Sequence, residues 1–321
     1  MGKILSVDGG GSKLSAVLFD DAFRLLGRGR SGGVNTNHTT PENSRANIVD
    51  CLGQVFGEKS SVYIDRFYVV FIGPVNILYE ELAKHATVGE IVPLHEARAG
   101  LLAGALWEEG ILALAGTGSD IFYVREEKTL NSVVGAWGPI LGDQGSGAWI
   151  GQKALRAVVA GIEGWGEPTL IHDLIRREWK LEKDWEMVRI IHGSVAPFRL
   201  AASLTSLVGE AARADDPVAL NILRKAGLLM AVQTDCLIRR QNIPKPYRRV
   251  VCCGGAWKTH PSMFAVFCER LQELYPGISV DKPWFEHVMA GPALEMLRQQ
   301  MPVRQARQSL SERFPDYVIH W

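Results

Sequence analysis

Two stretches of the chain repeat the order strand, glycine turn, strand, and this repetition restricts the fold more than any other feature. The first, KILSVDGGGSKLSAVLFD, covers residues 3–20, and the second, GILALAGTGSDIFYVR, covers residues 110–125. A third strand-like run, residues 248–253, is followed by GGAWKT. Helix-like segments alternate with these runs; in residues 43–58, for example, the apolar side chains recur at helical spacing. The pattern predicts a duplicated α/β domain with a cleft between the copies.

Composition narrows the class of partner. The chain has 321 residues, enough for two ordinary domains, and its 35 basic residues balance 35 acidic ones. This balance gives no electrostatic reason to expect a nucleic acid or an anionic membrane as partner, so we expect a small molecule. The five cysteines form no Cys-x-x-Cys pair, and the longest apolar run is interrupted by Pro74 and Asn76. A cytoplasmic location is expected.

The glycine turn DGGGSK, residues 8–13, suggests phosphate binding. An aspartate ends the first strand, and three residues without side chains follow it. Glycine permits positive φ and lets the backbone approach a ligand closely. A plain hairpin turn would give the same letters, so both interpretations stay open. The turn GGAWKT is not a Walker loop, because Trp257 stands before Lys258 where that motif needs glycine. Phosphates would therefore lie between two facing turns.

A longer motif gives a family resemblance. Residues 135–151, GAWGPILGDQGSGAWIG, resemble the GGWGP, LGDEGS and YWI signature of N-acetylglucosamine kinases and the wider BadF/BadG/BcrA/BcrD ATPase family. The turns AGTGS and GGAW and the stretch VNTNHT stand in the family's order, and the resemblance covers about residues 3–297. It implies two actin-like, ribonuclease-H-like domains of the α/β class with a nucleotide and sugar cleft between them.

The resemblance also implies domain bounds. The N-terminal domain would span residues 1–115 and the C-terminal domain residues 116–287, and a helix at about 288–300 would cross back to the first domain. The tail, residues 301–321, has no assigned role.

Carried over residue by residue, the resemblance implies ATP and Mg²⁺ as cofactors. Asp8 would orient Mg²⁺ through water. The phosphates and the adenosine would contact three turns, whose matched residues are Gly10, Gly11, Ser12 and Lys13, then Gly116, Thr117 and Gly118, then Gly254 and Gly255. Thr117 would donate a hydrogen bond to the γ-phosphate.

The sugar site is implied in the same way. Asn37 would hydrogen-bond a ring hydroxyl and Asp143 would bind the sugar, with Thr117 and Gly138 also in contact. Carboxylates suit sugars because each oxygen accepts two hydroxyl hydrogens. The alternative for Asp143 is a turn residue before Gly145.

One position departs from the family pattern. Family kinases carry an aspartate at the head of a helix, where it takes the proton from the attacking hydroxyl, but here Glu96 follows His95. Glutamate has the same chemistry on an arm one methylene longer, and phosphoryl transfer depends on placement. Glu96 is therefore a working base, an acid that complements the helix dipole, or the mark of a lost kinase step. His95 is an alternative base or a structural residue.

The leading hypothesis is an ATP-dependent amino-sugar kinase that phosphorylates the 6-hydroxyl of N-acetylglucosamine or a related hexosamine. One alternative is a BadF-type ATPase that drives a partner protein; such activators hold an iron–sulfur cluster, whose ligand spacing the cysteines here do not show. Another is a catalytically silent sensor of sugar or nucleotide. A homodimer is left open.

Overall fold

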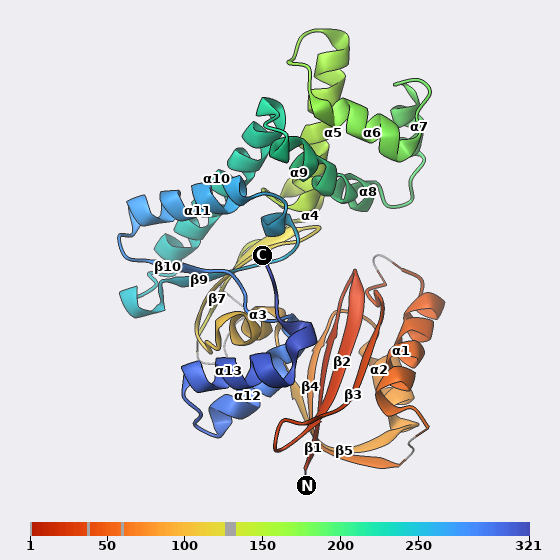
Figure 1. The fold of residues 1–321 in the computed structure, drawn as a ribbon, viewed down its shortest axis with the longest axis vertical. Coiled ribbons are helices and arrows are strands. Elements are labelled where there is room, and N and C mark those ends of the chain that lie inside the picture. The colour runs from red at the N-terminus through yellow and green to blue at the C-terminus, as the bar shows by residue number, and fades with distance from the viewer. Residues whose placement is uncertain (1, 37–38, 59–60, 126–132) are drawn as a thin grey trace. The chain divides into compact units, whose positions relative to one another are not determined.

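The structure is a computed structural model that describes residues 2–36, 39–58, 61–125 and 133–321. The chain divides into two compact units (Figure 1). Unit 1 contains residues 1–108 and 283–320, and unit 2 contains residues 109–282 with Trp321. Each unit is built around one five-stranded sheet with helices, which confirms the predicted α/β class.

The first sheet has the order β3-β2-β1-β4-β5. Its strands are β1 (Lys3–Gly9), β2 (Lys13–Asp20), β3 (Leu25–Gly32), β4 (Val62–Phe71) and β5 (Ala86–Pro93). β1 and β2 form the predicted hairpin, with Asp8 opposite Ser15, while β1 runs parallel to β4. The sheet is therefore mixed, and the first glycine turn lies at the end of its central strand.

The second sheet repeats this topology. Its order is β10-β9-β6-β7-β8, with strands β6 (Gly110–Ala115), β7 (Ser119–Val124), β8 (Val133–Gly135), β9 (Arg249–Cys253) and β10 (Ser279–Asp281). β6 pairs antiparallel with β7 and parallel with β9, as β1 does with β2 and β4. The predicted duplication is confirmed. Because β6 belongs to this sheet, the division falls before residue 109 rather than after residue 115.

Helices cover both faces of the first sheet. One face packs on α1 (Pro41–Phe56) and α2 (Val75–Ala83). The other packs on five elements, which are α3 (Glu96–Ala105), η3 (His287–Met289), α12 (Ala290–Arg298), α13 (Val303–Arg313) and η4 (Pro315–Tyr317). Successive β1 residues point to opposite faces of the sheet. Ile4 packs on the face covered by α3 and α12, and Leu5 packs on the face covered by α1 and α2.

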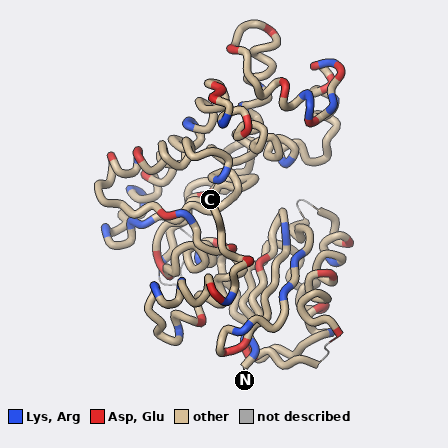
Figure 2. The backbone as a smooth tube through the Cα atoms, viewed as in Figure 1, with Lys and Arg blue, Asp and Glu red and all other residues tan. Residues whose placement is uncertain are grey.

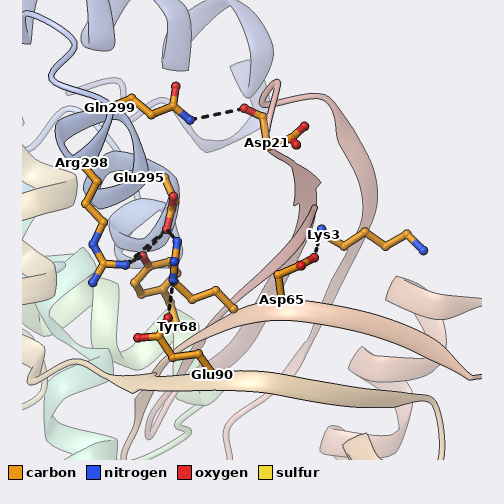
Figure 3. Close-up of polar contacts among 9 residues, drawn as sticks. Lys3, Asp21, Asp65, Tyr68, Glu90, Glu295, Arg298 and Gln299 are labelled. Atoms are coloured by element: carbon orange, nitrogen blue, oxygen red, sulfur yellow. Dashed lines mark hydrogen bonds and ion pairs between the residues drawn. The ribbon is translucent and has the colours of Figure 1, made fainter. Parts of the chain in front are cut away.

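A buried polar network ties the returning segment to the first sheet. Glu295 of α12 is 5% exposed and accepts hydrogen bonds from the Tyr68 hydroxyl and from Arg66, both on β4. Arg298 donates to the same hydroxyl at 2.7 Å, so Tyr68 lies between the two α12 side chains (Figure 3). Nearby, Ser6 Oγ on β1 donates to the Val288 carbonyl at 2.6 Å. These contacts fix residues 286–298 against the central strands.

The second unit is richer in helices. They are α4 (Gly138–Leu141), α5 (Gly147–Glu163), α6 (Leu170–Trp179), α7 (Glu186–His192), α8 (Pro197–Ser203), α9 (Thr205–Arg213), α10 (Pro217–Arg240), α11 (Pro261–Leu274), η1 (Lys245–Tyr247) and η2 (Ala256–Lys258). One hydrophobic core joins alternate β6 residues to α5, α6 and α9–α11. Trp257 lies in this core and donates from Nε1 to the Ala113 carbonyl at 3.0 Å.

Charge is mixed across both units, with acidic and basic residues interspersed along the chain (Figure 2). Within the described ranges, no helix combines the length and the apolar character that crossing a membrane requires. Cys252 and Cys253 are buried in β9, the predicted strand.

Candidate active site

The first glycine turn connects β1 to β2 through residues 10–12. Gly10 N donates to Lys13 O at 3.1 Å, and Gly10 O accepts from Val34 N at 2.8 Å. A Cβ on Gly9 would lie 2.7 Å from the Phe71 ring, so packing requires glycine there. Neither Gly9 nor Gly10 has φ in the left-handed region. The suggestion that this turn uses positive φ is wrong for these two residues, and close approach explains Gly9.

A different set of glycines is not required by the protein's own packing. Among the glycines whose surroundings are described, four have no atom within 4 Å of a built Cβ and no left-handed φ, namely Gly10, Gly53, Gly116 and Gly255. Gly53 lies within α1, but the other three lie one in each of the three turns predicted to contact the nucleotide. Neither packing nor backbone conformation excludes a side chain at these three positions. A ligand that approaches the backbone would exclude one.

Two carboxyl groups of unit 1, those of Asp8 and Glu96, interact electrostatically. Asp8 is the last residue but one of β1, Glu96 is the first residue of α3, and both are partly buried. Burial raises the pKa of Glu96; the charge of His287 opposes the rise, and the charge of Asp8 adds to it. Burial likewise raises the pKa of Asp8, against the effects of His287 and Lys13. Acids with raised pKa in a shared site are typical of proton-transfer chemistry.

His95 has a structural role beside Glu96. It is the N-cap of α3, and its Nδ1 accepts a hydrogen bond from Ala97 N at 3.2 Å. Burial lowers the pKa of His95, which favours the neutral ring that such a cap requires. Because Nδ1 is occupied in this way, the structure matches the structural alternative for His95.

Lys13 and two residues that the sequence analysis did not single out form an ion cluster. Glu286 accepts from Lys13 Nζ at 2.5 Å and from Arg30 Nη2 at 2.9 Å. Although burial acts to raise it, the pKa of the Glu286 carboxyl lies below its ordinary value because of these two cations. Glu286 therefore stays ionised beside the turn.

The second glycine turn, residues 116–118, connects β6 to β7 in unit 2. Its backbone is tied to the start of α5, since Gly147 N donates to Gly116 O at 2.8 Å and Ala148 N donates to Thr117 O at 3.1 Å. Thr117 is exposed, so its hydroxyl is available to a ligand. A Cβ on Gly118 would lie 2.8 Å from Asp143 Oδ2, which explains this glycine by packing.

Asp143 lies against the second turn. Its side chain is buried, its φ is +53°, and the backbone N–H groups of Ser119 and Gly138 donate to its carboxyl group. Burial raises its pKa, and the two donors oppose the rise. Asp143 thus joins the start of β7 to the start of α4, in keeping with the turn-residue alternative. A carboxylate accepts about four hydrogen bonds, so capacity for a ligand remains.

The third turn follows β9 and lies against the second. Gly254 has φ +109°, and a Cβ there would lie 2.2 Å from the Ala115 carbonyl oxygen. Only glycine satisfies both conditions. The next residue, Gly255, is exposed and faces open space. Gly254 thus brings the ends of β6 and β9 together, and Gly255 leaves an open position beside them.

Comparison with known proteins identifies the family. The profile of the BadF/BadG/BcrA/BcrD ATPase family matches residues 5–283. The chain belongs to this family. Over 284 residues it is 26% identical to an N-acetylmuramic acid/N-acetylglucosamine kinase of Clostridium acetobutylicum, which covers 86% of this chain and 92% of the relative. An N-acetyl-D-glucosamine kinase of Dictyostelium discoideum is 23% identical over 301 residues, with the same coverage of 86% and 92%.

Comparison with solved structures shows the same fold. A candidate N-acetylglucosamine kinase from Porphyromonas gingivalis superimposes with a TM-score of 0.68 and 19% identity, covering 94% of this chain and all of that one. The predicted family and fold are confirmed.

In this BadF-family protein the structure brings the predicted site residues into two groups. One group, in unit 1, holds Asp8, Gly10, Gly11, Ser12, Lys13 and Glu96. The other, in unit 2, holds Gly116, Thr117, Gly118, Gly138, Asp143, Gly254 and Gly255. Asn37 lies outside the described residues. His287 and Glu286 were missed because no local motif marks them; the only signal was that the segment beginning at His287, next to Glu286, resembles the family's returning helix.

Proposed function

We propose that this protein is an ATP-dependent amino-sugar kinase that transfers the γ-phosphoryl group of ATP to the 6-hydroxyl of N-acetylglucosamine or a related hexosamine. The observation that carries this proposal is the set of open glycines, one in each turn, at Gly10, Gly116 and Gly255. The family supports ATP as the donor, and the relatives that cover most of the chain are named amino-sugar kinases.

The three turns would let the nucleotide approach the backbone closely. Gly10, Gly11 and Ser12 would contact the β- and γ-phosphates, and Lys13 would add a positive charge. Thr117, exposed in the second turn, would donate its hydroxyl to the γ-phosphate. Gly254 and Gly255 would lie under the adenosine. The cleft predicted between the domains stays a prediction.

The residues near Asp8 suit Mg²⁺. Within the described part of the chain, no three side chains of the metal-binding types form a cage. Mg²⁺ in kinases is commonly held by one or two carboxylates together with substrate phosphates, which matches a single Asp8. Ser15, opposite Asp8 across the hairpin, is fully buried, and its hydroxyl has no hydrogen-bond partner among the described atoms, so a bound water would satisfy it. When bound, the ion would neutralise charge on the phosphates.

Glu96 would act as the general base. Its ionised carboxylate would accept the proton of the 6-hydroxyl as the oxygen forms a bond to the γ-phosphorus and the bond to the β-phosphate oxygen breaks. The raised pKa makes Glu96 a stronger base than an ordinary glutamate, and nearby His287 opposes full protonation. Asn37 and Asp143, with Thr117 and Gly138, would hydrogen-bond the sugar.

Sugar-dependent ADP formation tests the proposal. The assay would contain Mg²⁺, ATP and one sugar from a panel of N-acetylglucosamine, glucosamine, muramic acid, N-acetylmannosamine and glucose, beside a control without sugar. The proposal predicts a rate far above the control with at least one amino sugar. ATP hydrolysis at the same rate with and without sugar would favour an ATPase that drives a partner protein. Binding of ATP and sugar without turnover would favour a silent sensor.

A further inference from the structure

Glu286 holds two cations at the first glycine turn. Its Oε2 accepts from Lys13 Nζ at 2.5 Å, and its Oε1 and Oε2 lie 3.0 and 2.9 Å from Arg30 Nη2. Lys13 directly follows the turn on β2, and Arg30 lies on the neighbouring strand β3. One carboxylate thus fixes the positions of two basic side chains on adjacent strands.

The segment that carries Glu286 is itself fixed on both sides. Glu286 N donates to the Tyr317 carbonyl at 3.0 Å, and two residues later the Val288 carbonyl accepts from Ser6 Oγ at 2.6 Å. The Glu286 side chain is 21% exposed, whereas that of Lys13 is 43% exposed. The carboxylate is therefore the better-anchored member of the pair, and the lysine is the member that reaches toward solvent.

The charge balance leaves room for an anion. Two cations and one carboxylate give the cluster one net positive charge. The Lys13 ammonium has three N–H donors, and Glu286 accepts from it, so donors remain for another acceptor. A free lysine side chain loses rotamer entropy when a ligand fixes it. A lysine that is already fixed avoids most of that cost.

We infer that Glu286 is a positioning residue, which holds the Lys13 ammonium at the first glycine turn so that its remaining N–H groups meet a nucleotide phosphate. This inference rests on the proposed function, because it takes Lys13 to contact the phosphates of ATP. Glu286 acts through Lys13 and touches neither substrate.

A double-mutant cycle tests the inference. The dissociation constant of the Mg²⁺ complex of the non-hydrolysable ATP analogue AMPPNP is measured for wild type, Lys13→Met, Glu286→Gln and the double variant. We expect Glu286→Gln to weaken binding about tenfold when Lys13 is present and less than about twofold in the Lys13→Met background, because contacting residues that act together are non-additive. Equal losses in both backgrounds would overturn the inference, as would tighter binding by Glu286→Gln.

Two controls separate positioning of Lys13 from a general effect of charge or of folding. Glu80→Gln removes the same charge from an exposed carboxylate of unit 1 that pairs with Arg45 at 2.8 Å, and it should leave AMPPNP binding unchanged. Thermal unfolding of each variant shows whether Glu286→Gln merely loosens the returning segment. A structural role would lower the melting temperature and weaken binding equally with and without Lys13, and that result would also overturn the inference.

The cycle measures binding without sugar or turnover, so it separates two failures. If wild type binds AMPPNP and the cycle is non-additive but no sugar supports ADP formation, the inference stands and the kinase proposal fails. If amino sugars are phosphorylated and the cycle is additive, the kinase proposal stands and the role of Glu286 fails.

Discussion

The first and second glycine turns, which follow β1 and β6, occupy the same topological position after the central strand of each sheet. The side chains beside them nevertheless differ in chemistry. Beside the first, Asp8 and Glu96 interact electrostatically with the side chain of His287. Beside the second, the Asp143 carboxyl group accepts hydrogen bonds from the backbone N–H groups of Ser119 and Gly138. The duplicated backbone places an open glycine in both turns, whereas the titrating groups suited to proton transfer gather in unit 1. Under the proposed function, one fold supplies two binding turns, and side chains make only the first reactive.

Removal of the Glu96 carboxylate tests this difference between the two turns with the largest expected effect on activity. Glu96→Gln is expected to lower sugar-dependent ADP formation by about 10²- to 10³-fold, because a positioned general base contributes that much. Its melting temperature should stay unchanged or rise, since a partly buried carboxyl whose charge is opposed by that of Asp8 is lost. Steady-state kinetics with the Glu80→Gln control would check this. A Glu96→Gln enzyme with near wild-type turnover would show that Glu96 only complements the helix dipole.

The third turn offers a matched pair of glycines. Gly254→Ala should destabilise the protein by about 3 kcal/mol or more, because it forces both a left-handed φ on alanine and an overlap with the Ala115 carbonyl. Gly255→Ala should leave the melting temperature nearly unchanged and weaken AMPPNP binding. Differential scanning fluorimetry and calorimetric titration measure the two effects. Equal losses of stability in both variants would mean that Gly255 is also required by the fold.

Through Glu96, a rise in pH should increase the activity of the protein and decrease its stability. Because the pKa of Glu96 is raised, the acid limb of kcat/KM should lie above the ordinary glutamate range and fall about tenfold per pH unit. The same raised pKa means that the folded state binds the proton more tightly than the unfolded chain does. The contribution of Glu96 to the free energy of unfolding therefore decreases as the pH rises through that range.

Glu96→Gln supplies the control for this prediction. The residual kcat/KM of this variant should show no acid limb. Its free energy of unfolding should also change less over the same pH range. A limb that persists unchanged in the variant would assign it to another group.

Local features of this chain were predictable from the sequence, and long-range ones were not. The hairpin after Lys3, the helix that contains Ile48 and the β9 strand followed from apolar spacing, because each depends on neighbours in the chain. The pair of Lys13 with Glu286 joins residues 273 positions apart, so no spacing could indicate it. Likewise, the glycine letters suggested phosphate binding, but only the packing around Gly9 and Gly10 shows which of them the fold itself requires.

The most direct test of the central claim is calorimetric titration of the Mg²⁺ complex of AMPPNP into wild type, Gly10→Ala, Gly116→Ala and Gly53→Ala. All three substitutions place a methyl group where the protein has open space, but only Gly53 lies outside the predicted turns. Binding to both turns predicts that Gly10→Ala and Gly116→Ala each weaken affinity by about tenfold or more while Gly53→Ala leaves it unchanged. Unchanged affinity in either turn variant would contradict the claim that both turns hold the nucleotide.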